Sequence, residues 1–306
     1  MLRFILSRII QGFVVVFAVI VITFGLLKAS PGGPFNKERQ MQPHVRAMIE
    51  AYYGLDQPWW VQLWRHVKGY ASFHFPESLK MPGRGVDEII AQGFPVSAAI
   101  GIPALLIALA LGIPLGAFAA LKPNSIEDRA SMLLAMAGLC MPSLVLGPLI
   151  AMIFGLKLRW FNVSGWYDAD DWVLPAATLG IIYSAYIARL TRGGLRETLA
   201  QDFIRTARAK GASEGAVVFR HAFKLACLPV LNYLGPAAAG LLTGSLVTET
   251  VFQIPGLGQH FISAAVNRDD NLAMATAAFY ATLIVGFNLL VDIVQAALNP
   301  KIGFKS

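Results

Sequence analysis

Long uncharged stretches alternate with charged segments along this chain, and the alternation predicts its elements. A helix needs about 20 apolar residues to cross a bilayer, and extra length is taken up by tilt. The pattern therefore predicts an all-α polytopic membrane protein with six transmembrane helices. Six stretches of 17 to 33 residues contain no Asp, Glu, Lys or Arg: 9–27, 89–121, 130–156, 172–188, 225–248 and 271–291.

The first apolar stretch predicts a membrane helix that is not cleaved. It exceeds the roughly 7–15 apolar residues of a secretory signal, and no Ala-x-Ala cleavage site follows it. Residues 28–34 instead have the composition of a helix end and a turn. We therefore divide the chain into a first span with its N-terminus at 1–29, an outer segment at 30–94 and a five-helix transmembrane core at 95–306.

Composition agrees with a membrane protein. Of the 306 residues, 56% are hydrophobic and 14% are charged, whereas a soluble domain carries roughly 25% charged residues. One or two of the apolar stretches would be compatible with core helices of a soluble protein. Six of them leave too little polar surface to cover them, which argues against a soluble enzyme.

The distribution of charge predicts which side of the membrane each segment faces. If both termini are cytoplasmic, the inner segments hold 14 of the 25 Lys and Arg but 5 of the 18 Asp and Glu, while the outer segments hold 11 of each kind. The positive-inside rule expects this asymmetry. It accounts for the net charge of +7 without a nucleic-acid partner. The inner segments are 1–8, 121–130, 189–226 and 298–306.

Two helices are predicted in the outer segment, residues 30–94. One begins near Pro43 and stops at Gly54, and the next begins near Pro58. The second helix places Trp59, Trp60, Leu63, Trp64 and Val67 on one face. Two interpretations remain open, because three tryptophans on one face suit either the lipid headgroup layer or packing within the segment itself.

The cytoplasmic segment 189–226 predicts a helical hairpin. Residues 198–210 form a good helix, Gly211 has the position of its C-terminal cap, and Ser213 with Glu214 begins a second helix. Basic and small residues are exposed in this arrangement. Composition leaves three roles open: an inert surface, binding to anionic membrane lipid, or docking of a cytoplasmic partner.

The sequence predicts no catalytic residues, no bound cofactor and no metal in this chain. It contains no His-Glu-x-x-His, no Gly-x-Ser-x-Gly and no Gly-Lys dipeptide, so it lacks a phosphate-binding P-loop. The two cysteines, Cys140 and Cys227, form no disulfide framework or metal-binding spacing. If ATP drives this protein, another subunit binds the ATP.

Two carboxylates in or beside the spans, Glu249 and Asp292, are candidates for a transport pathway. Ionisable residues inside a membrane are functional by default expectation. The alternative for each is a partnered carboxylate that fixes a helix interface. For Asp292 the two interpretations carry equal weight, and for Glu249, close to the outer end of the fifth span, the structural one is favoured.

Three stretches resemble the permeases of bacterial ATP-binding-cassette importers, in the dipeptide, oligopeptide and nickel group. The first is the cytoplasmic segment 202–211, continuing to Pro229; the others are 244–259 and 53–58. The broad family motif begins Glu-Ala-Ala, whereas Arg205 stands here at the Glu position, a departure typical of the peptide group. Residues 31–39 and 94–98 are most similar to the B permease of oligopeptide systems.

This resemblance implies the partners and the roles of residues. A periplasmic or lipid-anchored substrate-binding protein would deliver an oligopeptide, a homologous second permease would complete the pathway, and two cytoplasmic subunits would bind ATP and Mg. The chain would be a multi-pass protein of the bacterial inner membrane. The residues implied in coupling to the ATPases are Asp202, Arg205, Thr206, Ala207, Lys210, Gly211 and Arg220, with Ala207 packed against a partner.

Other functions stay open at this point. The same importer class carries dipeptides, glutathione or nickel, although nickel is disfavoured because all five histidines lie outside the predicted spans. A proton-coupled secondary transporter would use Asp292 and would be supported by inverted repeats, of which no clear example is visible. A membrane enzyme is disfavoured by the missing catalytic motifs.

Overall fold

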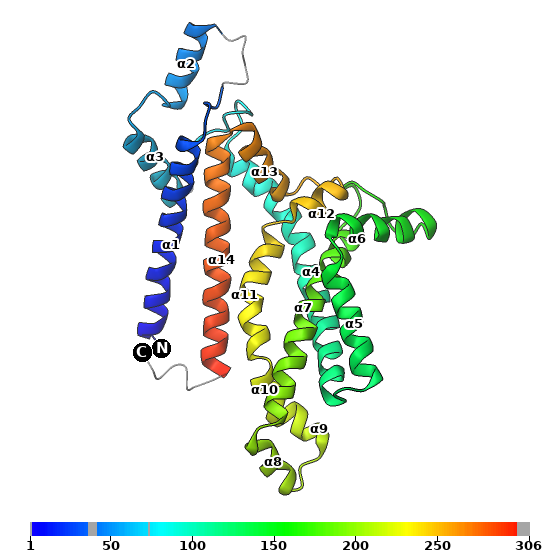
Figure 1. Cartoon of the computed structure of the whole chain (residues 1–306). Coiled ribbons are helices and arrows are strands. Elements are labelled where there is room, and N and C mark those ends of the chain that lie inside the picture. The colour runs from blue at the N-terminus through cyan, green and yellow to red at the C-terminus, as the bar shows by residue number, and fades with distance from the viewer. Residues whose placement is uncertain (1, 36–41, 73, 299–306) are drawn as a thin grey trace. The chain divides into compact units, whose positions relative to one another are not determined.

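Helices account for the regular structure of this protein (Figure 1). The computed structural model describes residues 2–35, 42–72 and 74–298, and among these the only β-pairing is an isolated bridge between Glu77 and Gly85. The chain forms two compact units. The N-terminal unit comprises Leu2–Ser97 and Pro255–Gly286, and the core unit comprises Ala98–Ile254 and the chain from Phe287. The predicted segments 1–29, 30–94 and 95–306 thus differ from these units.

The N-terminal unit contains α1 (Leu2–Ala29), α2 (Pro43–Tyr53), α3 (Trp59–Ser72), α13 (Leu257–Asn267) and parts of α4 (Val86–Leu121) and α14 (Asp270–Leu298). The core unit contains the rest of α4 and α14 and the following elements: α5 (Ile126–Cys140), α6 (Ser143–Ile150), η1 (Ala151–Lys157), α7 (Val173–Leu199), α8 (Asp202–Ala209), α9 (Glu214–Ala216), η2 (Val217–Ala222), α10 (Phe223–Ala226), α11 (Leu228–Leu242) and α12 (Leu246–Val251).

Five described helices are long and apolar enough to cross a membrane, and they lie at Ile5–Ala29, Val86–Leu121, Val173–Leu199, Leu228–Val251 and Asp270–Ala297. A bent pair, α5 with α6 and η1, brings the number to six if it counts as one span. The shortest predicted stretch, 172–188, belongs to a helix of 27 residues that continues ten residues past Arg189. A helix can outlast its uncharged stretch because charged residues are good helix formers.

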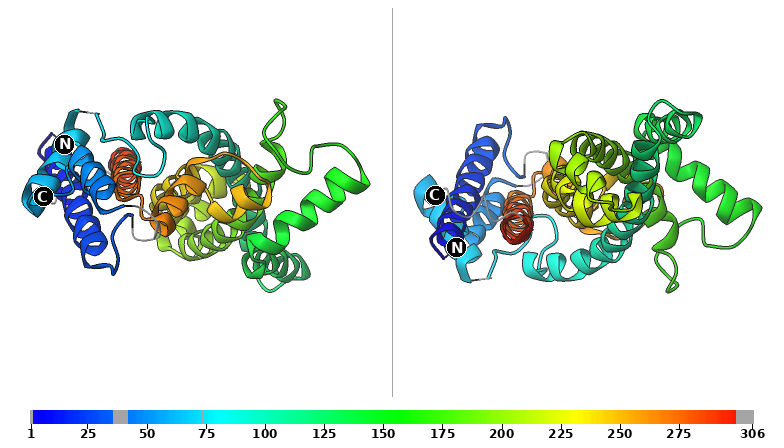
Figure 2. Two further views of the ribbon diagram at one scale, coloured as in Figure 1. Left: turned by 90° about the horizontal axis from the view of Figure 1, so that it is seen from above. Right: turned by 90° about the horizontal axis from the view of Figure 1, so that it is seen from below.

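The third predicted span is not a straight helix. It bends by 104° between Cys140 and Ser143, where Pro142 follows Met141. Proline disfavours helical backbone at the residue before it, and Met141 accordingly has an extended conformation. Viewed from above, α6 runs sideways out of the core unit rather than alongside α5 and α7 (Figure 2). Counting uncharged residues could not reveal this break.

Helix α7 is the centre of the core unit and packs against α5, α6, α10 and α11. Glycines let α4 approach it closely: a Cβ added at Gly112 or Gly116 would overlap backbone or side chains of Ser184, Ile187 and Ala188. Small residues at helix crossings allow this in membranes, where dispersion contacts replace the hydrophobic effect. The closeness of α4 and α7 therefore depends on the absence of side chains at these two positions.

The two helices predicted within residues 30–94 are present. Pro43 is the first residue of α2, and Gly54 ends it with φ of 66°. The five residues predicted to share one face of α3 behave in two ways. Leu63 and Val67 pack on Ile20 and Phe24 of α1. The tryptophan side chains are instead 57–66% exposed. The structure therefore places Trp59, Trp60 and Trp64 outside the packing of the N-terminal unit.

A polar turn between α13 and α14 holds the N-terminal unit together. The buried Asp269 carboxylate accepts hydrogen bonds from the Ser78 hydroxyl and from the Leu79 amide, the latter at 3.1 Å. Arg268, with φ of 61°, donates to the backbone oxygens of Leu27, Ser30 and Pro31. The chain after α1 and the chain before α4 are thus both attached to this turn.

Candidate functional site

Residues 189–226 form the predicted helical hairpin at one end of α7, opposite the end that meets α12 (Figure 1). Helix α7 ends at Leu199, Ala200 and Gln201 break the helix, and α8 starts at Asp202. The predicted start of the first hairpin helix at Thr198 was therefore wrong. Thr198 belongs to α7, where its hydroxyl donates a hydrogen bond to the Gly194 carbonyl at 2.8 Å. The second helix begins as predicted, with the Ser213 hydroxyl accepting from the Ala216 amide.

Gly211 makes the turn between the two arms of the hairpin. Its φ is 81°, a left-handed conformation that glycine adopts without steric cost. The Gly211 amide donates to the Arg208 carbonyl at 2.9 Å, and the Ala212 amide donates to the Ala207 carbonyl at 3.1 Å. This pair of bonds is the Schellman motif, which satisfies the last carbonyls of a helix. The predicted cap position is thus realised at Gly211.

The hairpin packs around an apolar core that it shares with the ends of α4 and α7. Ile204 of α8 is fully buried, and Ala207 and Ala212 pack beside it as partly buried residues. Ala207 thus packs partly against this core, and its expected contact with a partner stays a prediction. The buried members of this core are Ala120, Leu195, Ile204, Val217, Val218, Ala222 and Ala226.

The other residues implied in coupling lie on the outside of the hairpin. Asp202 and Arg205 are exposed and lie 3.6 Å apart as an ion pair, and the Thr206 hydroxyl donates to the Asp202 carbonyl. Lys210 and Gly211 are exposed at the turn, and Arg220 is exposed on η2. The structure thus brings Asp202, Arg205, Thr206, Lys210, Gly211 and Arg220 to the surface of one small element.

Two aromatic residues on this surface were missed in the sequence. Phe203 is 39% exposed and Phe219 is 77% exposed. Phe219 lies in the π-helical segment η2, where Val217 and Val218 take the buried positions. The sequence held one signal for the exposure of Phe219. It directly follows Val217 and Val218, and a helix that buries these two valines on one side turns the next residue toward the surface. An exposed aromatic among basic residues is the composition that protein interfaces favour.

An ion pair joins the two arms across the turn. The Arg208 guanidinium donates to both carboxylate oxygens of Glu214, at 2.7 and 3.1 Å. Hydrogen bonds from Arg208 lower the pKa of Glu214. The bidentate geometry fixes the relative orientation of the arms more than it adds stability, since both residues are exposed.

A second ion pair connects α7 to the start of α5. Arg192 donates to both carboxylate oxygens of Asp128, at 2.5 and 2.7 Å, and Asp128 is buried. Asp128 also accepts from the Asn124 amide, and the Ser125 hydroxyl caps α5 by accepting from the Asp128 amide. The turn after α4, the start of α5 and the stem of the hairpin are therefore fastened together.

The two pathway candidates lie on different helices. Glu249 is 1% exposed in α12, beside the Ser245 cap at the opposite end of the core unit from the hairpin. Asp292 is half-buried near the end of α14. The burial of Glu249 agrees with the interpretation that it fixes local structure, since α12 packs on α6 and α7.

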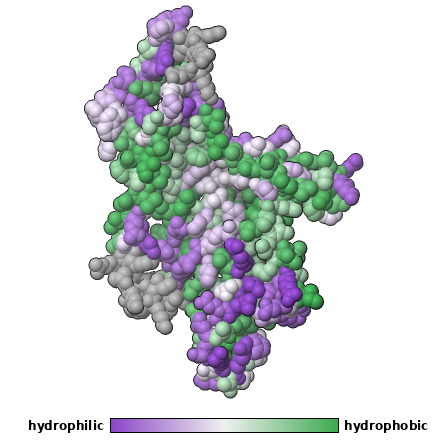
Figure 3. Space-filling model, viewed as in Figure 1, coloured by the Kyte–Doolittle hydropathy of each residue, from purple (hydrophilic) through white to green (hydrophobic). Residues whose placement is uncertain are grey.

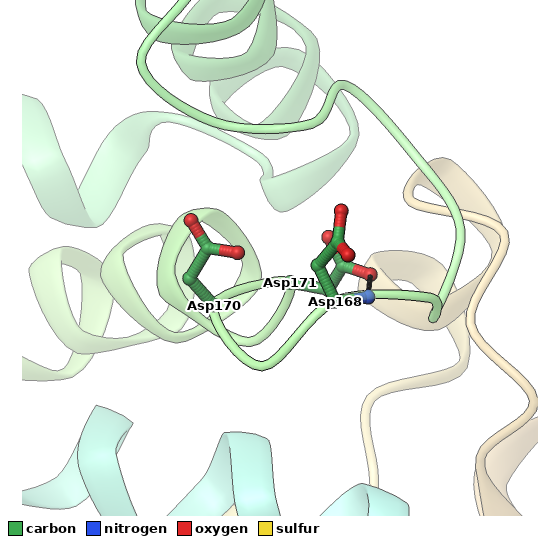
Figure 4. Close-up of side chains that lie close together, drawn as sticks. All are labelled: Asp168, Asp170 and Asp171. Carbon is green, nitrogen blue, oxygen red and sulfur yellow. Dashed lines mark hydrogen bonds between the residues drawn. The ribbon is translucent and has the colours of Figure 1, made fainter.

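Three aspartates in the loop before α7 are close enough to share a cation, and Figure 4 shows them. Asp171 is already engaged: its carboxylate accepts from the Tyr167 and Asp168 amides and from the Asn162 side chain. Burial opposes ionisation of Asp171, but these hydrogen bonds outweigh it and lower its pKa. The arrangement serves to order the loop.

Comparison with known proteins places these features in a family. Residues 112–304 match the family described as binding-protein-dependent transport system inner membrane component, and residues 1–78 match its N-terminal component. The oligopeptide transport system permease protein OppB of Salmonella typhimurium and that of Escherichia coli K12 are each 42% identical over 99% of this chain and all of theirs. The dipeptide permease DppB of Bacillus subtilis is 38% identical over 99% of this chain and 98% of its own.

Solved structures show the same fold at lower identity. An amino acid ABC transporter crystallised with histidines covers 69% of this chain and 94% of its own at 17% identity, with a TM-score of 0.53. The MetNI methionine ABC transporter in an inward-facing conformation covers 69% and 97% at 16% identity, with a TM-score of 0.59. This chain is a multi-pass inner-membrane protein that belongs to the family of binding-protein-dependent transport system inner membrane components.

Proposed function

We propose that this chain is the permease subunit of an ATP-driven importer that moves oligopeptides inward across the membrane. The observation that carries the proposal is 42% identity to oligopeptide permeases over nearly the whole chain. Relatives described as dipeptide permeases are 34–38% identical over the same extent, so dipeptide import is the second candidate. The distinction between them concerns the length of the cargo, not the mechanism.

The proposal includes a division of labour among subunits. A second, homologous permease completes the pathway, a binding protein delivers the peptide, and two cytoplasmic subunits bind ATP and Mg. The absence of a Gly-Lys dipeptide supports this division, since a P-loop requires that lysine. This chain then holds no cofactor of its own and catalyses no reaction.

The hairpin of α8, α9, η2 and α10 is the proposed contact with one ATPase. Support comes from the exposed Phe203 and Phe219 among basic side chains, from the internal core that keeps the hairpin rigid, and from its attachment to α7. A rigid element fixed to a membrane helix can transmit a movement of its partner. Nucleotide would thereby bias the permease between two conformations.

The proposed orientation puts both termini and the hairpin in the cytoplasm. It follows from the excess of basic residues in the segments that contain the hairpin. Reporter fusions at Lys80 and at Gly211 should then report the periplasm and the cytoplasm respectively. Both reporters on one side would contradict this topology.

Uptake in cells tests the proposed cargo. A strain that lacks peptide uptake, supplied with this chain and its partner subunits, should accumulate penta-alanine, and should lose that ability when this chain alone is omitted. Accumulation of di-alanine without penta-alanine would favour the dipeptide alternative. Accumulation that persists without the ATPases and stops with a proton ionophore would favour a secondary transporter instead.

A further inference from the structure

The exposed sides of α7 and α11 differ from the other exposed helix surfaces of the core unit. Helices α4, α5 and α6 expose large apolar side chains, such as Leu106, Leu133 and Leu144 at 61–67% exposure. Among the described residues, neither α7 nor α11 exposes a large apolar side chain. In Figure 3 the surface over α11 is accordingly pale and purple, whereas the surface over α6 is green.

The two helices form one continuous surface, in which Arg189, Asn232 and Gly240 are exposed and three tyrosines are half-buried. Tyr186 of α7 stacks on Tyr233 of α11, with ring centroids 5.4 Å apart, and Tyr183 lies 6.4 Å from the same ring. A Cβ at Gly240 would lie 3.3 Å from the Tyr183 hydroxyl, which places that hydroxyl over α11. We call this surface the tyrosine face; its residues are Tyr183, Tyr186, Arg189, Asn232, Tyr233 and Gly240.

Arg189 lies at the end of the tyrosine face nearer the hairpin. Its guanidinium carbon is 5.0 Å from the centre of the Tyr186 ring, a cation–π contact. Within the described part of the chain, no carboxylate forms an ion pair with Arg189. The side chain is exposed, about 24 Å along α7 from Val173 at 1.5 Å per residue. An oriented positive charge is thus available for an acidic group.

Contact with lipid hydrocarbon is unfavourable for the polar tyrosine face. A polar or charged side chain in a span is costly against hydrocarbon and normally faces a bundle interior or a water-filled cavity. Asn232 is an example: it is exposed on α11, and its side-chain oxygen accepts a hydrogen bond from Gln295 at 2.6 Å. The apolar surfaces of α4, α5 and α6 meet lipid, whereas the tyrosine face meets something polar.

We propose that the tyrosine face is a binding surface for the transported peptide, with Arg189 receiving its C-terminal carboxylate. This inference deepens the proposed function and rests on it. The tyrosine hydroxyls and the Asn232 amide can form hydrogen bonds with the backbone that all peptides share. The aromatic rings can contact peptide side chains of any kind. A guanidinium pairs with a carboxylate, the one group that every unmodified peptide presents as an anion. Recognition of this kind tolerates variable sequences.

A cysteine-labelling experiment tests whether peptide covers the face. In the complete complex in vesicles, with Cys140→Ser and Cys227→Ser, we compare Tyr233→Cys and Asn232→Cys with Leu134→Cys, an exposed apolar position on α5. A water-soluble thiol reagent should modify the first two readily and the third hardly at all. Penta-alanine under turnover should slow modification of the first two several-fold.

The outcomes separate the inference from the function on which it rests. If the complex with the unmodified chain takes up no penta-alanine, the proposed function fails. If uptake is normal but penta-alanine leaves both labelling rates unchanged, only the binding surface is refuted. If the reagent reaches neither position and both variants lose the second permease on purification, the face is a contact between permeases and the inference is overturned.

Substitution of Arg189 tests the carboxylate contact. Arg189→Gln should lower penta-alanine uptake about tenfold, as expected for one charge-assisted hydrogen bond, while Arg189→Lys retains most of the uptake. Permease amount and recovery of the complex should not change. Equal uptake by Arg189→Gln and the unmodified chain would overturn this assignment, as would equal losses in the Gln and Lys variants.

Discussion

His66 is a partly buried histidine in α3, and its ring centre lies 6.3 Å from that of Phe24. Burial, reinforced by the positive charges of Arg65 and Lys28, lowers its pKa to about 4. In the unfolded chain the imidazole takes up a proton near pH 6.5, but in the folded chain it stays neutral until about pH 4. Stability is therefore fully present above the unfolded value and falls as the pH drops between these two values.

This difference gives a first prediction. Lowering the pH from 7 to 5 should cost the N-terminal unit about 2 kcal/mol of stability through His66. Protease digestion of the segment between α1 and α4 in the intact complex measures the loss. His66→Gln, which carries no charge at either pH, should weaken the dependence. An unchanged pH dependence in His66→Gln would show that other groups cause it.

Gly211 gives the second prediction. Because its φ is 81° but nothing lies within 4 Å of an added Cβ, a substitution there is strained by conformation and not by crowding. Gly211→Val should therefore destabilise the turn by about 1–2 kcal/mol, and Gly211→Asn by less, since Asn tolerates this region. Hydrogen exchange of residues 202–226 in the purified complex measures the difference. Equal exchange in the two variants would contradict the assigned role of the turn.

At the scale of elements, the ion pair between α5 and α7 should contribute to stability. Asp128→Asn leaves Arg192 without its partner in a site where the aspartate is almost fully buried. We expect a loss of about 2 kcal/mol, seen as a lower Tm of the purified complex. The matched control is Glu127→Gln, which removes an exposed pair with Lys122 and should cost less than about 1 kcal/mol. Similar losses in both variants would refute the contribution of burial.

The hairpin surface gives a fourth prediction. Phe219→Ala removes an exposed aromatic side chain without disturbing the hairpin core, unlike any acidic substitution of the partly buried Ala207. Uptake should fall several-fold, with ATPases lost on purification or hydrolysing ATP without transport. The control is Tyr167→Ala, an exposed aromatic before α7 in the same unit. Normal uptake in Phe219→Ala would remove this residue from the coupling surface.

Sequence patterns predicted the positions and ends of helices better than their directions and their packing. The apolar stretches predicted where helices lie, and Pro43, Gly54, Gly211 and Ser213 predicted helix ends, because caps and turns depend on one or two local residues. The bend near Pro142 was missed, since uncharged length says nothing about direction. The tyrosine face was missed for another reason: Tyr186 and Tyr233 are 47 positions apart in sequence, and only packing brings their rings together.

At the scale of the whole molecule, each class of surface has a proposed partner. We assign the apolar surfaces of α4, α5 and α6 to lipid, the hairpin to an ATPase, and the tyrosine face to the peptide. The charge asymmetry predicts that the hairpin faces the cytoplasm, where ATP is present. Each assignment rests on a different set of residues, so each can fail without the others.

The central claim is that this chain forms part of a peptide pathway driven by ATP bound to other subunits. The most direct test is penta-alanine accumulation in vesicles that contain the purified complex and its binding protein. We expect accumulation that requires ATP, stops with vanadate, resists proton ionophores and disappears without this chain, while the chain alone hydrolyses no ATP. Accumulation driven by a proton gradient without ATP, or ATP hydrolysis by the chain alone, would contradict it.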